Sequence, residues 1–315
     1  MYRDNIIALA IPAYNEEKLI SKTVATVPAF VDRIYVVNDA SRDGTGKRLE
    51  GLAAKHKRLT IITNPKNRGI GYSVTAGLKR ATQEGADIAG VIAGDAQCDP
   101  AYMQGMIDCL LDENFDYVKA NRFLHAKALQ KMPAYRRIGN IVITLLTKFA
   151  TGYYSIFDTQ NGYGMFRRSL LVRMPWELIG ERYDYENTLL IALSILGAKV
   201  KDVAVPAIYG DETSSIKFWP VAMRALRVVS AGFWKRMYYS YVIYNFHPIA
   251  LFLFAGLALL LLGMLIGVWI VVMRFGWGIT PSTGTVMLSV LPFLTGFQLV
   301  LTALMLDINR ENKPV

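Results

Sequence analysis

Residues 6–17 are Ile-Ile-Ala-Leu-Ala-Ile-Pro-Ala-Tyr-Asn-Glu-Glu, a short apolar run that passes through a proline into polar residues. The run is too short to be the hydrophobic core of a signal peptide, and an acidic pair follows it. Its length and its boundary at Pro12 are typical of a buried β-strand. We therefore expect a strand near the start of the chain and an amino terminus in the cytosol.

Strand-like and helix-like segments alternate along residues 5–210. After the first strand, the predicted strands are 33–39, 59–64 and 88–94, and the predicted helices are 16–30, 45–57 and 70–85. Strands separated by helices of this length imply right-handed crossovers and a mostly parallel sheet in an α/β domain. In such sheets ligands lie beyond the carboxyl ends of the strands. The chemistry is therefore expected at four polar segments, which are Pro12–Glu17, Asn38–Thr45, Asn64–Gly71 and Gly94–Pro100.

The composition excludes several classes of protein. The chain has 315 residues, a formal net charge of +10, 53% hydrophobic residues and 19% charged residues. Such an apolar content excludes a disordered chain, a collagen-like chain and a disulfide scaffold. The two cysteines, Cys98 and Cys109, are not spaced as a C-x-x-C motif. A reduced cytosolic domain is therefore expected.

Two long uncharged runs lie near the carboxyl end, at 248–273 and 286–306. At a rise of about 1.5 Å per residue, each run as a helix could cross a hydrocarbon layer about 30 Å thick. The segment between them is short and rich in Gly, Pro and Thr, as a tight loop is. We predict two transmembrane helices; the alternative for each run is a buried core helix of a soluble protein.

The distribution of charge predicts how these spans are oriented. No Asp or Glu occurs between Glu212 and Asp307, and basic residues gather just before the first span. Since positive residues stay on the cytosolic side of a membrane, both termini are expected to face the cytosol. Along 213–245 basic residues alternate with aromatic rings, which is typical of helices lying in the plane of the lipid headgroups. A helix packed on the soluble domain with a solvated basic edge is the alternative.

The predicted organisation has three parts. Residues 1–212 form a cytosolic domain, 213–245 form amphipathic interfacial helices, and 246–315 form a two-span anchor with a short cytosolic tail. The positive net charge is better explained by anionic lipid and by bound phosphates than by nucleic acid. The sequence is compatible with a homo-oligomer as well as with a monomer.

Carboxylates follow two of the predicted strands. Asp39 lies at a strand tip with no helix to cap, which favours contact with a nucleobase or a ribose, whereas Asp43 before Gly44 favours an ordinary turn. Asp95 and Gln97 offer two oxygen donors on one loop, the type of ligand that Mg²⁺ or Mn²⁺ takes together with phosphates. Asp99 before a proline predicts a helix N-cap.

Six segments taken together resemble a known family. They are Pro12-Ala13-Tyr14-Asn15-Glu16-Glu17, Asn38-Asp39-Ala40-Ser41, Asn67-Arg68-Gly69, Gly94-Asp95-Ala96-Gln97, Arg136-Arg137-Ile138-Gly139-Asn140 and Asp158-Thr159-Gln160-Asn161-Gly162-Tyr163. In this order they resemble the inverting glycosyltransferases of family 2, which have the Rossmann-like GT-A fold. With the paired carboxy-terminal spans, the chain is similar to the polyprenyl-phosphate glycosyltransferases, the group that contains dolichyl-phosphate mannose synthase.

The resemblance implies a role for each matching position. The residues that would line the nucleotide pocket are Pro12, Tyr14, Glu16, Asp39, Gly94 and Asp95. Asp95 and Gln97 would hold a divalent metal, Mg²⁺ or Mn²⁺, on the donor diphosphate. The residues that would bind the acceptor phosphate or the diphosphate are Arg122, Arg136, Arg137, Gly162, Ser215 and Lys217. Asp95, Arg122, Arg136 and Asp158 would carry the catalysis.

The chain departs from the family pattern at three positions. The family's metal motif is often Asp-x-Asp, but its first position here is Ala93, which leaves metal dependence open. Gly164 follows Tyr163 where an arginine is common, and Asn38 replaces a common aspartate. We interpret these departures as marks of a subgroup.

The implied reaction transfers a sugar from a nucleotide-sugar, UDP- or GDP-linked, to a membrane polyprenyl phosphate with inversion. A phosphate monoester is already ionised at pH 7, so the acceptor needs positioning by cations more than a general base. Two alternatives remain, a non-catalytic nucleotide-binding membrane scaffold and a processive polysaccharide synthase. The second is disfavoured because no Arg-Trp pair occurs in the chain. The sequence does not identify the sugar or the length of the prenyl chain.

Overall fold

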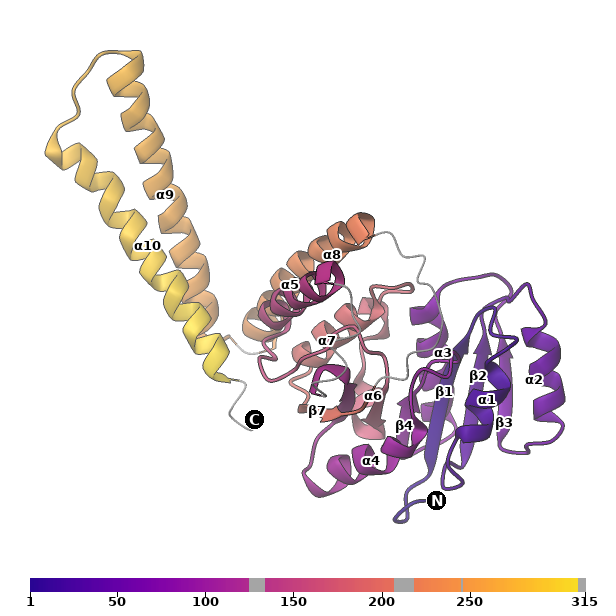
Figure 1. Ribbon diagram of the computed structural model, residues 1–315. Coiled ribbons are helices and arrows are strands. Elements are labelled where there is room, and N and C mark those ends of the chain that lie inside the picture. The colour runs from indigo at the N-terminus through magenta and orange to yellow at the C-terminus, as the bar shows by residue number, and fades with distance from the viewer. Residues whose placement is uncertain (125–133, 207–217, 245, 311–315) are drawn as a thin grey trace. The chain divides into compact units, whose positions relative to one another are not determined.

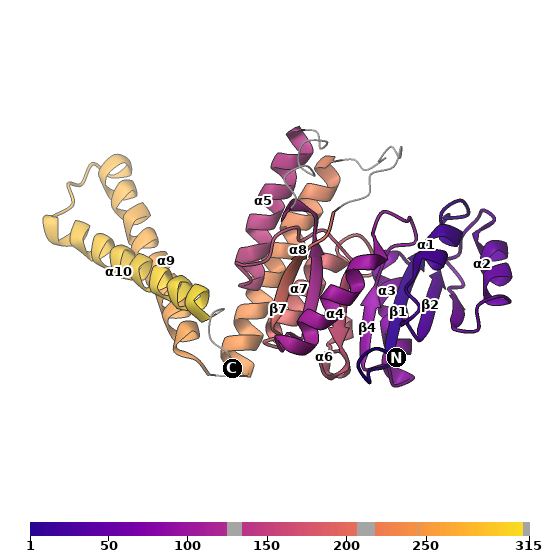
Figure 2. The same ribbon diagram turned by 60° about the horizontal axis from the view of Figure 1, so that its bottom comes forward.

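The computed structural model describes residues 1–124, 134–206, 218–244 and 246–310 (Figure 1). The chain divides into two compact units, Met1–Phe233 and Trp234–Val315. The first unit is an α/β domain, and the second contains a long helical hairpin (Figure 2).

A seven-stranded sheet forms the centre of the first unit, and its strand order is β3-β2-β1-β4-β6-β5-β7. The strands are β1 (Ile7–Ala13), β2 (Arg33–Asn38), β3 (Leu59–Thr63), β4 (Ile88–Val91), β5 (Tyr117–Asn121), β6 (Gly164–Arg167) and β7 (Val200–Ala204). β6 runs antiparallel to both of its neighbours, and the other pairings are parallel. The predicted mostly parallel sheet is confirmed.

Helices cover both faces of this sheet. They are α1 (Ile20–Thr26), α2 (Thr45–Ala53), α3 (Ile70–Gln83), α4 (Met103–Asp112), α6 (Arg168–Arg173) and α7 (Tyr185–Ile195), and a further helix, α5 (Ala134–Thr151), packs on α7. One apolar core joins α1, α2 and α4 to one face, and a second core joins α3, α6 and α7 to the other. The first unit is therefore a three-layer α/β/α domain.

Strand β1 lies in the middle of these layers, and all seven of its residues are buried. Leu9 and Ile11 belong to one core, whereas Ala8 and Ala10 belong to the other, because successive side chains of a strand point to opposite faces. Helix α3 packs closely on the alanine side, since a Cβ on Gly77 would lie 2.6 Å from the Cβ of Ala10. The short, continuous apolar run that predicted the strand therefore reflects burial on both faces.

The order of the strands reverses at β1. From β1 the chain adds β2 and β3 on one side of the sheet, and then crosses to place β4 on the other side. A crevice for ligands forms outside the carboxyl ends of the strands at such a switch point. The segments after β1 and β4 therefore lie where a ligand is expected.

The second unit contains the end of α8 (Phe218–Tyr238), a π turn at Tyr239–Ile243, α9 (Pro248–Gly276) and α10 (Thr283–Arg310). The predicted spans at 248–273 and 286–306 lie within α9 and α10, and both helices are long and apolar enough to cross a membrane. Their backbones approach closely, because a Cβ on Gly263 would lie 2.7 Å from the Phe293 nitrogen, and one on Gly296 would lie 2.6 Å from the Leu260 nitrogen. Small residues at the interface of two apolar helices allow this close packing.

Candidate active site

The carboxyl ends of β1 and β4 meet at the switch point. The Gly94 N–H donates a hydrogen bond to the Pro12 carbonyl over 3.2 Å, and Thr23 donates to the Gly94 carbonyl over 2.9 Å. A Cβ on Gly94 would come within 3.0 Å of the Pro12 oxygen, so this approach favours glycine. The two segments that the resemblance assigned to the nucleotide are therefore adjacent.

The loop after β1 is joined to the loop after β2. The Asn15 N–H donates to Ser41 Oγ over 3.0 Å, and the Glu16 N–H donates to Thr45 Oγ1 over 2.8 Å. Asn15 has a left-handed backbone with φ of 57°, a conformation that asparagine tolerates better than most residues. The result is a fixed turn that leaves the Tyr14 side chain exposed at the edge of the crevice.

Asp39 has a structural role that the sequence did not indicate. Its carboxylate accepts hydrogen bonds from the N–H groups of Arg68 and Gly69, over 2.9 Å and 2.7 Å, at the start of α3. Asn64 donates to it over 2.7 Å, and the residue is buried. Asp39 therefore holds the two residues that precede α3, a contact across some thirty residues of sequence. A nucleotide contact at Asp39 stays a prediction.

Asp43 and Asp99 serve local structure, as the sequence predicts. Asp43 accepts from the Thr45 N–H over 3.0 Å, and this turn precedes α2. Asp99 accepts from the Ala101 N–H over 2.9 Å and begins a short 3₁₀ turn at Pro100–Tyr102.

The Asp95–Gln97 loop supplies oxygen donors without forming a complete metal site. The Gln97 N–H donates to Asp95 Oδ1 over 3.1 Å, and Ala96 between them has a left-handed φ of 55°. Both side chains are partly exposed, and the described residues contain no cluster of three His, Cys, Asp or Glu side chains. One carboxylate and one amide fit Mg²⁺ or Mn²⁺ only if substrate phosphates complete the coordination. The donor set therefore suits a metal that arrives with a nucleoside diphosphate.

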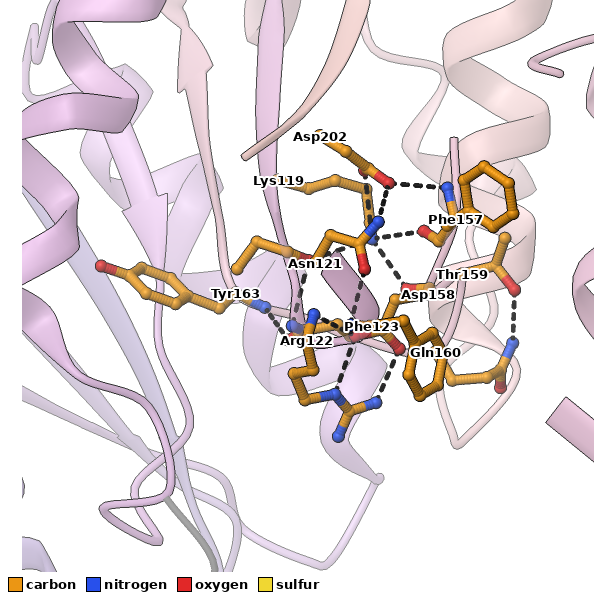
Figure 3. A network of polar contacts seen from close by, with 12 residues as sticks. Lys119, Asn121, Arg122, Phe123, Phe157, Asp158, Thr159, Gln160, Tyr163 and Asp202 are labelled. Atoms are coloured by element: carbon orange, nitrogen blue, oxygen red, sulfur yellow. Dashed lines mark hydrogen bonds and ion pairs between the residues drawn. The ribbon is translucent and has the colours of Figure 1, made fainter. Parts of the chain in front are cut away.

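An ion pair lies at the carboxyl end of β5. Arg122 directly follows β5, and its Nε and Nη2 each donate to the Asp158 carboxylate over 2.8 Å (Figure 3). The Arg122 backbone N–H donates to the same carboxylate over 3.0 Å. The Asp158 side chain is 1% exposed, whereas that of Arg122 is 28% exposed. The carboxylate therefore orients a guanidinium that still faces solvent.

Lys119 and Asp202 form a second charged pair beside the first. They are partners in the parallel register of β5 and β7, and the Lys119 Nζ lies 3.6 Å from Asp202 Oδ1. The same ammonium donates to the carbonyls of Phe157 and Asp158, over 3.3 Å and 2.7 Å (Figure 3). Asp202 accepts in turn from the Phe157 N–H over 2.6 Å. The pair thus holds the Phe157–Asp158 segment against β5.

The pKa values of the two buried carboxyl groups, Asp158 and Asp202, are shifted in opposite directions. Burial alone would raise the pKa of Asp158, but hydrogen bonds from Arg122 and the positive charges of Arg122 and Lys119 bring that pKa below its ordinary value. Burial raises the pKa of Asp202, which the charge of Lys119 offsets only in part. Asp158 is therefore held as the anion that Arg122 requires.

The Cys98 thiol is influenced both by the Asp95–Gln97 loop and by the Arg122–Asp158 pair. Burial raises the pKa of its thiol to about 12, the negative charge of Asp95 raises it further, and the positive charge of Arg122 lowers it. The charge of Asp158 acts on the same thiol. The charges of Asp95, Arg122 and Asp158 therefore all act on one buried thiol.

A small pocket continues the site beyond Gly162, with about the volume of one water molecule. Its lining includes Lys119, Gly162 and Glu186. A Cβ on Gly162 would lie 1.8 Å from the Tyr185 hydroxyl, so no larger residue fits without a shift. Burial raises the pKa of Glu186 to about 8, and the charges of Arg122 and Lys119 reduce that shift.

Sequence reasoning missed Lys119, Glu186 and Asp202. Lys119 is a lysine inside an apolar strand, a signal that could have indicated a buried charge with a partner on a neighbouring strand. Four predicted residues cannot be placed. Ser215 and Lys217 lie outside the described residues, and so do the side chains of Arg136 and Arg137, whose backbone belongs to α5.

Comparison with known proteins agrees with this geometry. Residues 8–174, just over half of the chain, match the profile of glycosyl transferase family 2. The chain belongs to that family. The match begins within β1 and extends through α6, so it contains Asp39, Asp95, Arg122 and Asp158.

Several relatives of this glycosyltransferase act on polyprenyl phosphates. It is 30% identical over 221 residues to the UDP-N-acetylglucosamine–dolichyl-phosphate N-acetylglucosaminyltransferase of Methanococcus voltae, covering 66% of this chain and 88% of the relative. It is 21% identical over 230 residues to the undecaprenyl-phosphate mannosyltransferase of Micrococcus luteus, covering 68% and 93%.

A solved structure confirms the fold of this glycosyltransferase. The glucosyl-3-phosphoglycerate synthase of Mycobacterium tuberculosis, in complex with Mn²⁺, UDP-glucose and phosphoglyceric acid, superimposes with a TM-score of 0.54 at 19% identity. The alignment covers 74% of this chain and 80% of the synthase. The expected GT-A architecture is therefore confirmed.

Proposed function

We propose that this glycosyltransferase moves a sugar from a nucleotide-sugar to the phosphate of a membrane polyprenyl phosphate, with inversion at the anomeric carbon. The observation that carries the proposal is the Arg122 guanidinium at the end of β5, which the buried Asp158 carboxylate orients through two hydrogen bonds. The names of the relatives support a dolichyl or undecaprenyl phosphate as the acceptor.

The cations of the site suit a phosphate nucleophile. In the proposed step a phosphate oxygen forms a bond to the anomeric carbon while the bond from that carbon to the diphosphate breaks and its electrons leave with the diphosphate. The acceptor is ionised near pH 7, so no proton has to be removed. Asp158 orients Arg122 through Nε and Nη2, and the guanidinium carries further N–H groups that can donate to a phosphate. Lys119 and Asp202 keep the Asp158 segment in place during this step.

The donor would lie at the carboxyl ends of β1 and β4. Pro12, Tyr14, Glu16 and Gly94 would line the nucleotide pocket, and Asp39 would fix its floor by holding Asn64 and the start of α3. Asp95 and Gln97 would hold Mg²⁺ or Mn²⁺ on the diphosphate, as the Mn²⁺ in the solved relative supports. A bound divalent ion would neutralise the charge that develops on the leaving diphosphate.

The helical hairpin suits an acceptor that stays in the bilayer. We propose that α9 and α10 span the membrane, with the catalytic unit and both termini in the cytosol. Part of α5 supports a membrane surface beside the site, because Ile141, Leu145 and Phe149 are about half exposed and recur every four residues along one side of that helix. Such a stripe can enter the headgroup region, as we propose for the interfacial helices of 213–245.

A transfer assay with purified full-length protein tests this function. A panel of UDP- and GDP-linked sugars is incubated with a short-chain polyprenyl phosphate, with the corresponding prenyl alcohol, or with no acceptor, and the released nucleotide is measured. We expect release with one nucleotide-sugar that depends on the phosphate acceptor. Equal release with all three acceptors would contradict the proposal, and binding of a nucleotide without any release would favour a scaffold.

A further inference from the structure

A buried ion pair joins two helices of the second unit. Arg236 lies in the last turn of α8, and Asp307 lies near the end of α10. The guanidinium donates from Nη1 to Oδ1 over 2.7 Å and from Nη2 to Oδ2 over 2.8 Å. The two side chains are only 4% and 2% exposed. This is a two-pronged contact between groups that are almost never buried unless they are paired.

Tyr241 donates a hydrogen bond to the same carboxylate, and an unusual backbone brings it there. In an α-helix, residues 236 and 241 would point about 140° apart, because each residue turns the helix by about 100°. The chain instead forms a π turn at Tyr239–Ile243, in which the Tyr244 N–H bonds to the Tyr239 carbonyl five residues earlier. Residues five apart then approach the same side of the helix. The π turn therefore lets Tyr241 and Arg236 meet one partner.

The pair disfavours a slide of α8 toward the start of α10. Asp307 is the first acidic residue after Glu212, so no carboxylate precedes it in α10. A buried charge that loses its partner is strongly destabilising, so a shift of one turn in that direction would be costly. His247 caps α9 by accepting from the Ile249 N–H over 3.3 Å, and its ring contacts Tyr241. The start of the first span is thereby tied to the same cluster.

We propose that the Arg236–Asp307 pair is a positioning contact that holds the last turn of α8 beside the end of α10. In this way the pair sets the depth, relative to the bilayer, at which the enzyme uses a lipid-linked acceptor. This inference rests on the proposed function. Helix α8 is continuous over Phe218–Tyr238, and its last turn belongs to the same compact unit as α9 and α10. The pair itself would touch no substrate.

Charge variants test the contact in full-length protein reconstituted in vesicles with anionic lipid. Arg236→Gln and Asp307→Asn each break the pair, and the double variant Arg236→Asp with Asp307→Arg restores it in reverse. The readout is the ratio of turnover with a long-chain polyprenyl phosphate in the bilayer to turnover with a short-chain soluble one. We expect each single variant to lower this ratio about tenfold, because misplacing a reactant is costly, and the double variant to recover most of it.

Lys235→Gln removes a neighbouring exposed positive charge and measures the effect of charge alone. An unchanged ratio in the single variants, or an equal loss with both acceptors, would overturn the inference. So would a failure of the double variant to recover the ratio while it inserts normally. These outcomes differ from failure of the proposed function, in which the unchanged protein would transfer sugar to neither acceptor.

A depth measurement that needs no turnover complements this assay. A fluorophore is attached to Tyr238→Cys in a background with Cys98→Ser and Cys109→Ser, and its quenching by lipids labelled at the headgroup is recorded. We expect Asp307→Asn to change the quenching and the double charge variant to restore it. Identical quenching in all variants would overturn the inference whether or not the protein transfers sugar.

Discussion

The guanidinium of Arg122 and the carboxylate of Asp158 form two parallel hydrogen bonds of 2.8 Å, although 36 residues separate them in the chain. The carboxylate is buried and the guanidinium is partly exposed. The contact therefore orients the guanidinium for which we propose a role in binding the acceptor phosphate.

Asp158→Asn should therefore impair both stability and acceptor use. The substitution removes the anion that pairs with the partly exposed Arg122, whereas Lys119 keeps Asp202, so the loss should be about 1–3 kcal/mol of unfolding free energy. The KM for the acceptor should rise more than the affinity for the nucleotide falls. Steady-state kinetics with nucleotide titration separates the two effects, and an equal loss of both would contradict the role assigned to Asp158.

Arg122→Lys isolates the geometry of the contact from its charge. Lysine keeps the positive charge but cannot make the two-pronged contact with a carboxylate or a phosphate. We expect the acceptor KM to rise about tenfold, the equivalent of one charge-assisted hydrogen bond, with nucleotide binding nearly unchanged. A lysine variant with normal acceptor KM would show that the planar grip is not used.

Asp95→Ala should abolish turnover while the protein still folds. The side chain is partly exposed, and the hydrogen bond that it accepts from the Gln97 N–H is worth about 1 kcal/mol. Turnover and Mn²⁺-dependent nucleotide binding are measured beside thermal unfolding. Asp99→Ala is the matched control, since it loses only a cap and should stay active. Near-normal turnover of Asp95→Ala would refute its role as a metal ligand.

The Gly162–Tyr185 contact predicts a specific rescue. In Gly162→Ala the new Cβ would meet the Tyr185 hydroxyl at 1.8 Å, so the protein should lose about 1–3 kcal/mol of stability through overpacking. Tyr185→Phe removes that oxygen, and the double variant should regain most of the loss. Thermal unfolding of the two single variants and the double variant measures this. Strictly additive losses would show that the contact does not limit the size of residue 162.

Glu186 should make the stability of the protein decrease as the pH rises. Its pKa rises from 4.5 to about 8 on folding, so between these values the folded state holds a proton that the unfolded state has lost. Stability should therefore fall as pH rises through this window, by about 1.4 kcal/mol per pH unit at most. Glu186→Gln should remove this slope, and the exposed Glu177→Gln should not. Melting temperatures between pH 5 and about 8 test it; parallel curves for the unchanged protein and Glu186→Gln would contradict the shifted pKa.

The sequence predicted the elements whose signal is local. The apolar runs that became β1, β2 and β3 each end in polar residues, and both membrane-length helices appear as uncharged runs. Contacts between distant segments could not be predicted. Nothing near Asp39 indicates that it binds the start of α3, and nothing near Lys119 indicates Asp202, because both partners are defined by the packing of strands and loops. The antiparallel β6 was missed for the same reason, since its neighbours lie far away in the chain.

The chemical structure of the lipid product shows whether the sugar has been joined to the phosphate of the acceptor. Full-length protein is incubated with the preferred nucleotide-sugar and a short-chain polyprenyl phosphate, and the purified product is examined by ³¹P and ¹³C nuclear magnetic resonance. We predict scalar coupling between phosphorus and the anomeric carbon, together with an anomeric configuration opposite to that of the donor. A released free sugar, or a sugar joined to the lipid without a phosphorus coupling, would contradict the account.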